Sequence, residues 1–356
     1  FALPSTPSFL LSTINSLQTQ YKLYYNFILL CMVIVKIHRI LAIVLTVISS
    51  LLQASILLDA FPVSTTHNHQ SSENNSNNMS SSFRLQGQVI GLVGASSGIG
   101  AAIAHALYSE GASVAIGARR TSKLEEVAKS CQQSHPTSPA SIVAFQCDVT
   151  DRSSVESFYE QTKKHYGGQK VNSLVCCAGV MYFTKMKNAM VDQWDQTIDV
   201  NCRGATNCMG VAIPQMLEKK KTEEDSSDRA DDVGGKLVFI TSDAGVRDFQ
   251  QLAVYCASKR FVETLVEITR RELVGTGVTL HTIQPGDVKG TELILQNTDQ
   301  EAATTMGVEI GKPVGEGFNR NQLLNPSDVA DAVVTVLTAP KHVAINSILV
   351  EPRDQE

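Results

Sequence analysis

The stretch Leu92-Val93-Gly94-Ala95-Ser96-Ser97-Gly98-Ile99-Gly100 decides the fold of this chain. The apolar run at 88–93 is typical of a buried strand, and the segment 98–110 that follows it has helical periodicity. A glycine-rich turn between a strand and a helix leaves the helix N-terminus open, where free N–H groups and the helix dipole both favour an anion. The spacing G-x-x-x-G-x-G therefore predicts a turn that binds the pyrophosphate of a nucleotide.

The three glycines of this turn have separate expected roles. Gly94 allows the tight turn, Gly98 lets the backbone approach the phosphates, and Gly100 lets the helix pack closely on the sheet. Glycines also cluster in ordinary loops, so this interpretation depends on the rest of the chain.

From Phe83 onward, apolar runs alternate with segments of helical period. Unbroken apolar strands that alternate with helices predict a parallel sheet covered on both faces. The predicted fold is α/β, a Rossmann-like, doubly wound parallel sheet of about seven strands that forms a single domain over residues 84–356. We predict strands near 88–93, 113–117, 142–147, 171–176, 236–241, 278–283 and 347–350, and helices near 98–110, 122–133, 151–166, 189–218, 253–274 and 327–338. Ser327 is the expected N-cap of the last helix, and 219–235 is an expected solvated loop.

Composition and charge limit the possible functions. The chain has 356 residues, of which 43% are hydrophobic and 18% charged, and this composition allows a sizeable core. The net charge is −5 without a basic block, which argues against a nucleic-acid partner. Eight cysteines are scattered, with no C-x-x-C pair and no zinc-ligand spacing. We therefore expect buried free thiols, no bound metal and a reducing compartment.

The N-terminal part differs in composition from the rest. We divide it into an extension at 1–39, a hydrophobic segment at 40–60 and a disordered linker at 61–83 rich in Ser and Asn. Residues 40–58 form a run of nineteen residues without a charge after a short basic patch, which fits either a transmembrane segment or a signal peptide. The expected location is membrane-associated or organelle-targeted, in the endoplasmic reticulum or a plastid, with the folded domain in a reducing compartment.

Four polar residues are the catalytic candidates. Tyr255 and Lys259 are four residues apart at the start of a helical pattern, so they share one helix face. The pKa of a free tyrosine is about 10, and a neighbouring ammonium group favours the phenolate, so we expect Lys259 to lower the pKa of Tyr255. Ser242 follows the apolar run 237–240 at a strand's carboxyl end, where open α/β sheets bind ligands. Asn201 is a polar residue within a helical pattern.

With these residues in this order, the chain resembles the short-chain dehydrogenase/reductases over roughly 85–355. The glycine turn is similar to the family's T-G-x-x-x-G-I-G motif, and the four candidates match the family's catalytic tetrad one by one. The resemblance implies that Tyr255 exchanges a proton with the substrate oxygen and that Lys259 lowers its pKa and holds the nicotinamide ribose. It also implies that Ser242 hydrogen-bonds the substrate oxygen and that Asn201 holds a water linking Lys259 to solvent.

The resemblance further implies a set of cofactor-binding residues. Asp148-Val149 matches the family's adenine site, Ala178-Gly179 brings backbone to the ribose, and Pro285-Gly286 matches the nicotinamide motif. The complete predicted set is Gly94, Ser96, Ser97, Gly98, Ile99, Gly100, Arg119, Arg120, Asp148, Val149, Ala178, Gly179, Tyr255, Lys259, Pro285, Gly286, Val288 and Thr291.

The residues after the second strand predict the cofactor. Enzymes that use NAD carry an Asp or Glu there for the ribose 2′-hydroxyl, whereas this chain has Ala118-Arg119-Arg120. A carboxylate would repel a 2′-phosphate and an arginine can bind it in a bidentate manner. Both arginines precede a helix, where positive charge is unfavourable, and this weakens the alternative that they only cap the helix. We expect NADP(H) to be preferred over NAD(H).

The sequence differs from the family pattern at three places, and each difference has an expected structural effect. The family's N-N-A-G is Cys176-Cys177-Ala178-Gly179 here, which removes two asparagines that usually brace the sheet and the cofactor edge. Val93 removes a hydroxyl that usually braces the turn. Gly290 is an apparent insertion that is expected to displace Thr291 from the carboxamide of the cofactor.

The segments 291–293 and 345–352 are most similar to the branch of NADP-dependent hydroxy-acid and clavulanate-type dehydrogenases. This branch implies a small hydroxy acid, such as serine or 3-hydroxypropanoate, and Arg247 and Arg320 are candidate partners of its carboxylate. Apolar residues between 289 and 320, where the family has its substrate lid, fit a more hydrophobic substrate, and core packing explains them equally well.

The predicted function is NADP(H)-dependent interconversion of a carbonyl and a primary or secondary alcohol. Two alternatives stay open at this point. One is a membrane-anchored reductase of lipid or retinoid carbonyls, attached through 40–58. The other is a non-catalytic NADP-binding sensor, favoured only by the lost asparagines. The resemblance also implies a homodimer or homotetramer formed through 189–218 and 253–274.

Overall fold

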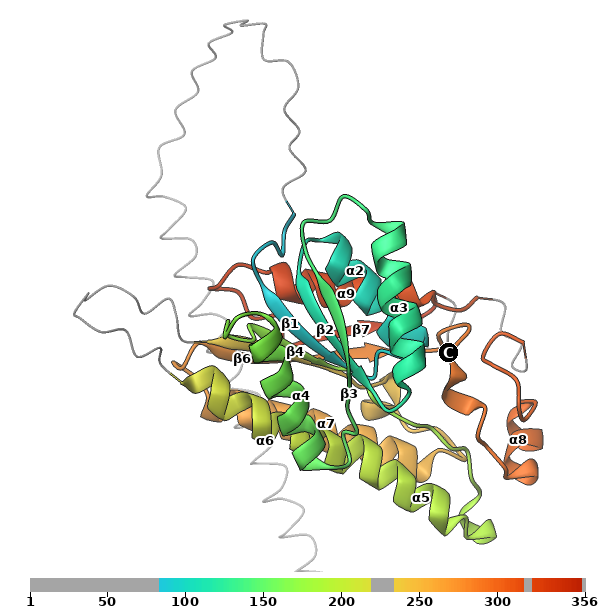
Figure 1. Cartoon of the computed structure of the whole chain (residues 1–356). Coiled ribbons are helices and arrows are strands. Elements are labelled where there is room, and N and C mark those ends of the chain that lie inside the picture. The colour runs from blue at the N-terminus through green and yellow to red at the C-terminus, as the bar shows by residue number, and fades with distance from the viewer. Residues whose placement is uncertain (1–82, 219–233, 317–321, 354–356) are drawn as a thin grey trace, which may run out of the picture. The chain divides into compact units, whose positions relative to one another are not determined.

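A computed structural model describes residues 83–218, 234–316 and 322–353. These residues form one sheet of seven parallel strands in the order β3-β2-β1-β4-β5-β6-β7 (Figure 1). The predicted Rossmann-like, doubly wound parallel sheet is confirmed. Its strands are β1 (Val89–Val93), β2 (Ser113–Ala118), β3 (Ile142–Gln146), β4 (Ser173–Cys176), β5 (Gly235–Ile240), β6 (Val278–Pro285) and β7 (Ser347–Val350). The order reverses between β1 and β4, and ligands of such sheets bind at the carboxyl ends of the strands there.

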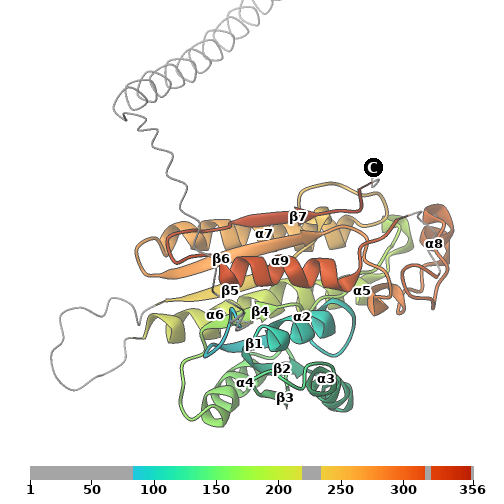
Figure 2. The same cartoon turned by 90° about the horizontal axis from the view of Figure 1, so that it is seen from above.

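Helices cover both faces of the sheet. One face carries α2 (Gly98–Ser109), α3 (Thr121–Ser134) and α9 (Pro326–Thr338), and the other carries α4 (Arg152–His165), α6 (Gly204–Leu217) and α7 (Ala253–Glu272). Figure 2 shows α2 and α9 side by side over the first of these faces. Because both faces are covered, the central strands are apolar along their whole length rather than alternating.

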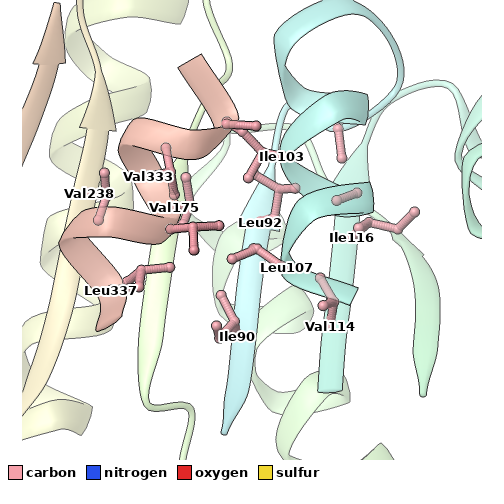
Figure 3. Close-up of a cluster of buried hydrophobic side chains, with 14 of the residues drawn as sticks. Ile90, Leu92, Ile103, Leu107, Val114, Ile116, Val175, Val238, Val333 and Leu337 are labelled. Carbon is pink, nitrogen blue, oxygen red and sulfur yellow. The ribbon is translucent and has the colours of Figure 1, made fainter. Parts of the chain in front are cut away.

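The core beneath α2 and α9 is made of branched aliphatic side chains (Figure 3). The strands contribute every second residue, since successive side chains point to opposite faces, and the helices contribute residues spaced four apart. The labelled members are Ile90, Leu92, Val114, Ile116, Val175 and Val238 from the strands, Ile103 and Leu107 from α2, and Val333 and Leu337 from α9. This packing fixes α2, and with it the glycine turn, against the end of β1.

Two helix predictions differ from the structure. The predicted helix 189–218 consists of α5 (Val191–Thr197), the π-helical turn η2 (Ile198–Arg203) and α6. The N-cap of α9 is Asn325 rather than Ser327, because Asn325 and Asp328 form a reciprocal capping box with a proline at the first helical position.

Short elements near the site were not predicted. They are η1 (Met186–Asn188), η4 (Asp243–Gly245), η5 (Glu292–Ile294) and α8 (Gln300–Met306). Each is seven residues or fewer, which is too short to give a periodic pattern in the sequence.

Several predictions concern residues outside the described ranges. These are the extension 1–39, the hydrophobic segment 40–60, all but the last residue of the linker 61–83, and most of the loop 219–235. Within 83–218, 234–316 and 322–353, none of the helices has both the length and the apolar character to cross a membrane.

Candidate active site

At two positions of the glycine turn, the surrounding backbone leaves room for glycine only. Gly94 has φ +85°, and a Cβ built on it would lie 2.3 Å from the backbone N of Ala178. A Cβ on Gly100 would lie 2.1 Å from the carbonyl O of Gly94. The turn is therefore in direct backbone contact with the loop after β4, which brings residues 94 and 178 to one place.

Backbone hydrogen bonds brace the turn. The N–H of Gly94 donates to the carbonyl O of Gly117 at 2.8 Å, and the N–H of Cys177 donates to the carbonyl O of Val93 at 2.9 Å. These bonds join β1 to both neighbouring strands, so the missing hydroxyl at Val93 leaves the turn well supported.

The N-terminus of α2 suits an anion. Its N-cap is Ser97, which has extended backbone and makes no side-chain capping bond, and no acidic residue lies in the first turn. Without a capping side chain, the first N–H groups of the helix and its dipole favour a negatively charged ligand.

A cavity of about 510 Å³ runs along the carboxyl ends of the strands. The glycine turn, Arg119, Arg120 and Asp148 line one part of it, and Ser242 and Tyr255 line another. All the predicted cofactor-binding residues line this cavity: Gly94, Ser96, Ser97, Gly98, Ile99, Gly100, Arg119, Arg120, Asp148, Val149, Ala178, Gly179, Tyr255, Lys259, Pro285, Gly286, Val288 and Thr291.

Ser242 follows β5 and begins η4. Its Oγ donates to Oδ1 of Asp243 at 2.8 Å and accepts from the N–H of Ala244 at 3.1 Å. Ser242 also hydrogen-bonds the side chain of Tyr255. These contacts hold the serine hydroxyl and the tyrosine hydroxyl together on the wall of the cavity.

The environment of Tyr255 differs from the expectation. Burial raises the pKa of Tyr255 well above its usual value, and the hydrogen bond with Ser242 lowers that pKa by less. Asp243 and Asp287 act in the same direction as burial. The expected lowering of the Tyr255 pKa by Lys259 is therefore not found, and desolvation of the phenolate is the largest cause of the shift.

Lys259 is buried on the same face of α7 as Tyr255. Its Nζ lies 5.6 Å from the centre of the Tyr255 ring and donates to the carbonyl O of Ile240 at 3.2 Å. Burial lowers the pKa of Lys259 to about 8, and Cys177 and Glu263 oppose that shift. A Cβ on Gly179 would lie 3.4 Å from this Nζ, so the glycine keeps the face of the ammonium group open to the cavity.

Asn201 lies in the π-helical turn η2, behind the cavity wall. Its Oδ1 accepts from the N–H of Val180 at 2.9 Å, and its Nδ2 donates to the carbonyl O of Val180 and to Oγ of Ser258, both at 3.0 Å. Asn201 and Lys259 line a separate cavity of about 20 Å³, large enough for about one water. The predicted water-holding role of Asn201 stays a prediction, and this space is compatible with it.

The two cysteines that replace the usual asparagines are packed as core residues. Cys176 is buried at the end of β4, and burial raises the pKa of the Cys177 thiol to about 12 while Lys259 opposes the shift. The seven described cysteines are all free thiols. No group of three or more His, Cys, Asp or Glu residues in the described ranges is arranged to hold a metal ion.

Thr291 lines the cavity despite the neighbouring Gly290, which has φ +69°. The threonine hydroxyl donates to the carbonyl O of Val288 at 3.2 Å, and its methyl group lies beside Gly98. Thr291 lies next to the glycine turn, and its predicted displacement from the carboxamide of the cofactor stays a prediction.

Three acidic residues of the site were not among the predicted site residues. Asp243 and Asp287 line the cavity and act electrostatically on Tyr255. Glu292 lines it too and forms an ion pair with Arg120 at 2.8 Å. The first two follow predicted site residues directly, which was a usable signal. Glu292 also directly follows a predicted site residue, Thr291, but its pairing with Arg120, far away in the chain, had no signal in the sequence.

Of the two arginines proposed for a carboxylate, only Arg247 lies within the described residues. Arg247 pairs with Glu351 at 2.9 Å and is not among the lining residues. Arg320 lies outside the described residues. The cations among the described lining residues are Arg119, Arg120 and Lys259.

The segment 291–314, called the lid here because the family resemblance places the substrate lid in this region, is tied to the loop after β4. The N–H of Phe183 donates to Oδ1 of Asn297 at 2.7 Å, and the N–H of Lys185 donates to Oδ2 of Asp299 at 2.9 Å. Asp299 also caps α8. The lid lines the cavity mainly with apolar side chains, including Leu293, Ile294, Leu295, Met306, Val308 and Val314.

Comparison with known proteins agrees with this geometry. Residues 88–302 match the family model described as short chain dehydrogenase. Over 271 residues the chain is 42% identical to a glycine betaine reductase of Emericella nidulans, covering 76% of this chain but only 19% of that protein. It is 32% identical to an uncharacterized oxidoreductase of Staphylococcus aureus, covering 75% of this chain and 98% of that protein. The solved closed form of a serine dehydrogenase with NADP+ is 26% identical, covers 76% of this chain and 96% of its own, and has a TM-score of 0.61.

Proposed function

The chain belongs to the short chain dehydrogenase family, and from that premise we propose that it is an NADP(H)-dependent oxidoreductase that interconverts a carbonyl and an alcohol. One observation carries the proposal. Ser242, Tyr255 and Lys259 line the same cavity as the glycine turn and the arginine pair. A nucleotide held at the turn would extend along the strand ends toward the tyrosine.

The residues present fit such a cofactor. Gly94 and Gly98 leave no side chain between the turn and the cavity, and the N-terminus of α2 is ready for a pyrophosphate. Arg119 and Arg120 lie just before α3, where a 2′-phosphate is expected. Lys259 would hold the nicotinamide ribose. The bound cofactor supplies the hydride.

The chain's own residues would handle the proton. Tyr255 donates its hydroxyl proton to the carbonyl oxygen in the reductive direction, while Ser242 donates a hydrogen bond to the same oxygen as negative charge develops there. For that bond the Ser242 hydroxyl must turn from Asp243 to the substrate. Lys259 and the small cavity beside Asn201 give Tyr255 a route for reprotonation.

The buried tyrosine rests in the protonation state that carbonyl reduction uses. Burial raises the pKa of Tyr255, so the neutral phenol is the stable form at neutral pH. The neutral phenol is the form that can donate a proton. Alcohol oxidation would require the phenolate, which this environment disfavours.

The test is nicotinamide absorbance with the full-length chain, with NADPH or NADH offered to aldehydes, keto acids and lipid ketones. We expect turnover with NADPH, and a loss of about 10²–10⁴-fold in the Tyr255→Phe variant with NADPH binding retained. Tyr159→Phe is the matched control, because it removes a buried hydroxyl without a hydrogen-bond partner in the described part of the chain. Tight NADPH binding without turnover on any carbonyl would favour the sensor alternative instead.

A second, narrower candidate concerns the substrate: an aldehyde that carries a positive charge. It is supported by Asp243 and Asp287, which are among the residues that line the cavity and which both raise the pKa of Tyr255. A substrate carboxylate would face these two acids, which speaks against the small hydroxy acids that the branch resemblance implied. Glycine betaine, in the name of the Emericella relative, is a quaternary ammonium compound, although this chain spans about a fifth of that protein.

Three aldehydes of similar size would test the charge preference. We expect kcat/KM to be highest for trimethylammonioacetaldehyde, lower for its neutral isostere 3,3-dimethylbutanal, and lowest for succinic semialdehyde. Asp287→Asn should reduce the cation-to-neutral ratio by about tenfold, the scale of one partly buried charge pair. The highest kcat/KM for succinic semialdehyde would contradict this candidate and return support to the acid substrates.

Attachment to a membrane through 40–58 and delivery to an organelle are separate proposals that rest on composition alone. The mass of the native protein and its release from membranes by carbonate would test them. A native chain that retains 40–58 and stays with the membrane supports the anchored form.

A further inference from the structure

A carboxylate from the lid occupies the site expected to bind the cofactor's 2′-phosphate. Nη2 of Arg120 lies 2.8 Å from Oε2 of Glu292, and Oγ of Ser97 donates to the same oxygen at 3.0 Å. The Arg120 guanidinium also donates to Oγ of Ser96 and Ser97 at 2.9 and 3.0 Å. An arginine and a serine from two different strand–helix junctions thus converge on one carboxylate oxygen.

The elements explain why this contact is an anion site. Ser97 is the N-cap of α2 and Arg120 is the N-cap of α3, so the carboxylate is held by side chains that start from two helix N-termini. Helix N-termini, an arginine and a hydroxyl donor are the groups that bind phosphate. The hydrogen bonds from Arg120 and Ser97 lower the pKa of Glu292, although burial acts against this shift. The carboxylate is therefore an anion at neutral pH.

Glu292 comes from a distant part of the chain. It is separated from Ser97 by 195 residues and begins η5, and Leu293, Ile294 and Leu295 after it line the cavity. The contact therefore joins the cofactor end of the cavity to the start of the lid.

We infer that Glu292 competes with the 2′-phosphate of the cofactor for Arg120 and thereby limits the preference for NADP(H) over NAD(H). This inference rests on the proposed function. A 2′-phosphate must displace the carboxylate from the guanidinium, because two anions cannot share one half-exposed arginine without repulsion. NAD(H) has a 2′-hydroxyl, which is neutral and leaves the ion pair largely in place. Glu292 is thus a specificity-determining residue that acts by weakening the binding of NADP(H).

The experiment measures dissociation constants of NADPH and NADH by nicotinamide fluorescence for the full-length chain and three variants. Glu292→Gln should lower the Kd of NADPH by about three- to fivefold, the scale of a half-exposed ion pair, and change that of NADH by less than twofold. Glu292→Ala should act in the same direction. Glu309→Gln is the matched control, since Glu309 forms an exposed ion pair with Lys312 in the same region and does not line the cavity.

A double-mutant cycle with Arg120→Ala separates competition from an indirect effect. In the Arg120→Ala background, Glu292→Gln should leave the Kd of NADPH unchanged, because the shared guanidinium is gone. Weaker NADPH binding in Glu292→Gln would overturn the inference, because it would mean that the glutamate stabilises the bound cofactor. Equal changes for NADPH and NADH, or none, would also overturn it. If the wild-type chain binds neither nucleotide, the proposed function fails first.

Discussion

At the residue scale, the site combines two groups that burial pushes in opposite directions. Burial raises the pKa of Tyr255 and lowers that of Lys259, because it disfavours the charged form of each. The result is a neutral phenol beside an ammonium group whose pKa is about 8. A proton donor and a group able to resupply the proton thus lie together near physiological pH, which suits the proposed acid–base role.

The buried ammonium group of Lys259 carries a stability cost that depends on pH. Its pKa is about 8 in the folded chain against 10.5 for the free group. Between these values the unfolded chain binds more protons at this site, so the stability of the wild type rises with pH across that window. Below about pH 8 the full penalty is present, roughly 3 kcal/mol for a shift of this size.

We therefore predict that Lys259→Met is more stable than the wild type at pH 7, and that the difference shrinks as pH approaches about 10.5. Thermal unfolding followed by circular dichroism at several pH values measures both. Lys129→Met, on the exposed part of α3, is the control and should show no such trend. A stability difference that stays constant from pH 7 to pH 10 would show that burial of the charge is not its cause.

At the element scale, the site is assembled from the junctions between strands and helices. The turn after β1 touches the loop after β4, η4 follows β5, and Asn201 joins η2 to the loop after β4. The π-helical turn was predicted as ordinary helix, since a local change in helix pitch leaves the apolar period nearly unaltered. Such turns are frequent at functional sites, and here it directs an amide at the backbone of Val180.

A glycine comparison tests the close contact at the turn. Gly94→Ala would place a methyl group 2.3 Å from the backbone N of Ala178, in addition to the strain of φ +85°. Gly167→Ala has a similar φ of +65° but nothing within 4 Å, so it isolates the cost of the dihedral angle, about 1–2 kcal/mol. We predict that Gly94→Ala costs about 2–3 kcal/mol more than Gly167→Ala in urea unfolding and also impairs NADPH binding. Equal losses would mean that the loop after β4 moves aside easily.

At the scale of the whole molecule, the order of the strands determines where the site lies. The helices on one side also expose a set of apolar residues to solvent. The cavity lies where the order reverses, so both halves of the sheet supply residues to it. On the outer side, exposed apolar residues repeat at a spacing of seven on two neighbouring segments: Val191 and Ile198 on α5 and η2, and Phe261 and Ile268 on α7. Residues seven apart share one helix face.

This apolar face agrees with the expected self-association through 189–218 and 253–274. Phe261 and Ile268 are 43% and 51% exposed in the single chain, and burial of this surface against a second copy would be favourable. We predict that the wild type is a dimer or tetramer by light scattering and that Phe261→Glu with Ile268→Glu shifts it to smaller species, because a charge in an apolar interface is costly. Gln132→Glu on α3 is the control for added charge. A double variant that keeps the wild-type mass would contradict this arrangement.

The sequence by itself determined the features that depend on covalent geometry and local pattern. Apolar runs between helical segments predicted all seven strands, because a strand buried on both faces must be apolar throughout. The spacing of Tyr255 and Lys259 predicted their common face on α7, since the helical repeat alone sets it. The glycine spacing predicted the turn, because only glycine tolerates a backbone contact as close as that of Gly94 with Ala178.

The contacts between residues far apart in the chain, and the burial of the site, were decided only by the tertiary structure. It brought Glu292 to Arg120, paired Arg247 with Glu351, and buried Tyr255 deeply enough to raise its pKa. Pairing between distant residues leaves no periodic trace in a sequence. Desolvation, in turn, depends on every element that covers a group, so the direction of a pKa shift at Tyr255 follows from the assembled cavity and not from its nearest neighbour in the chain.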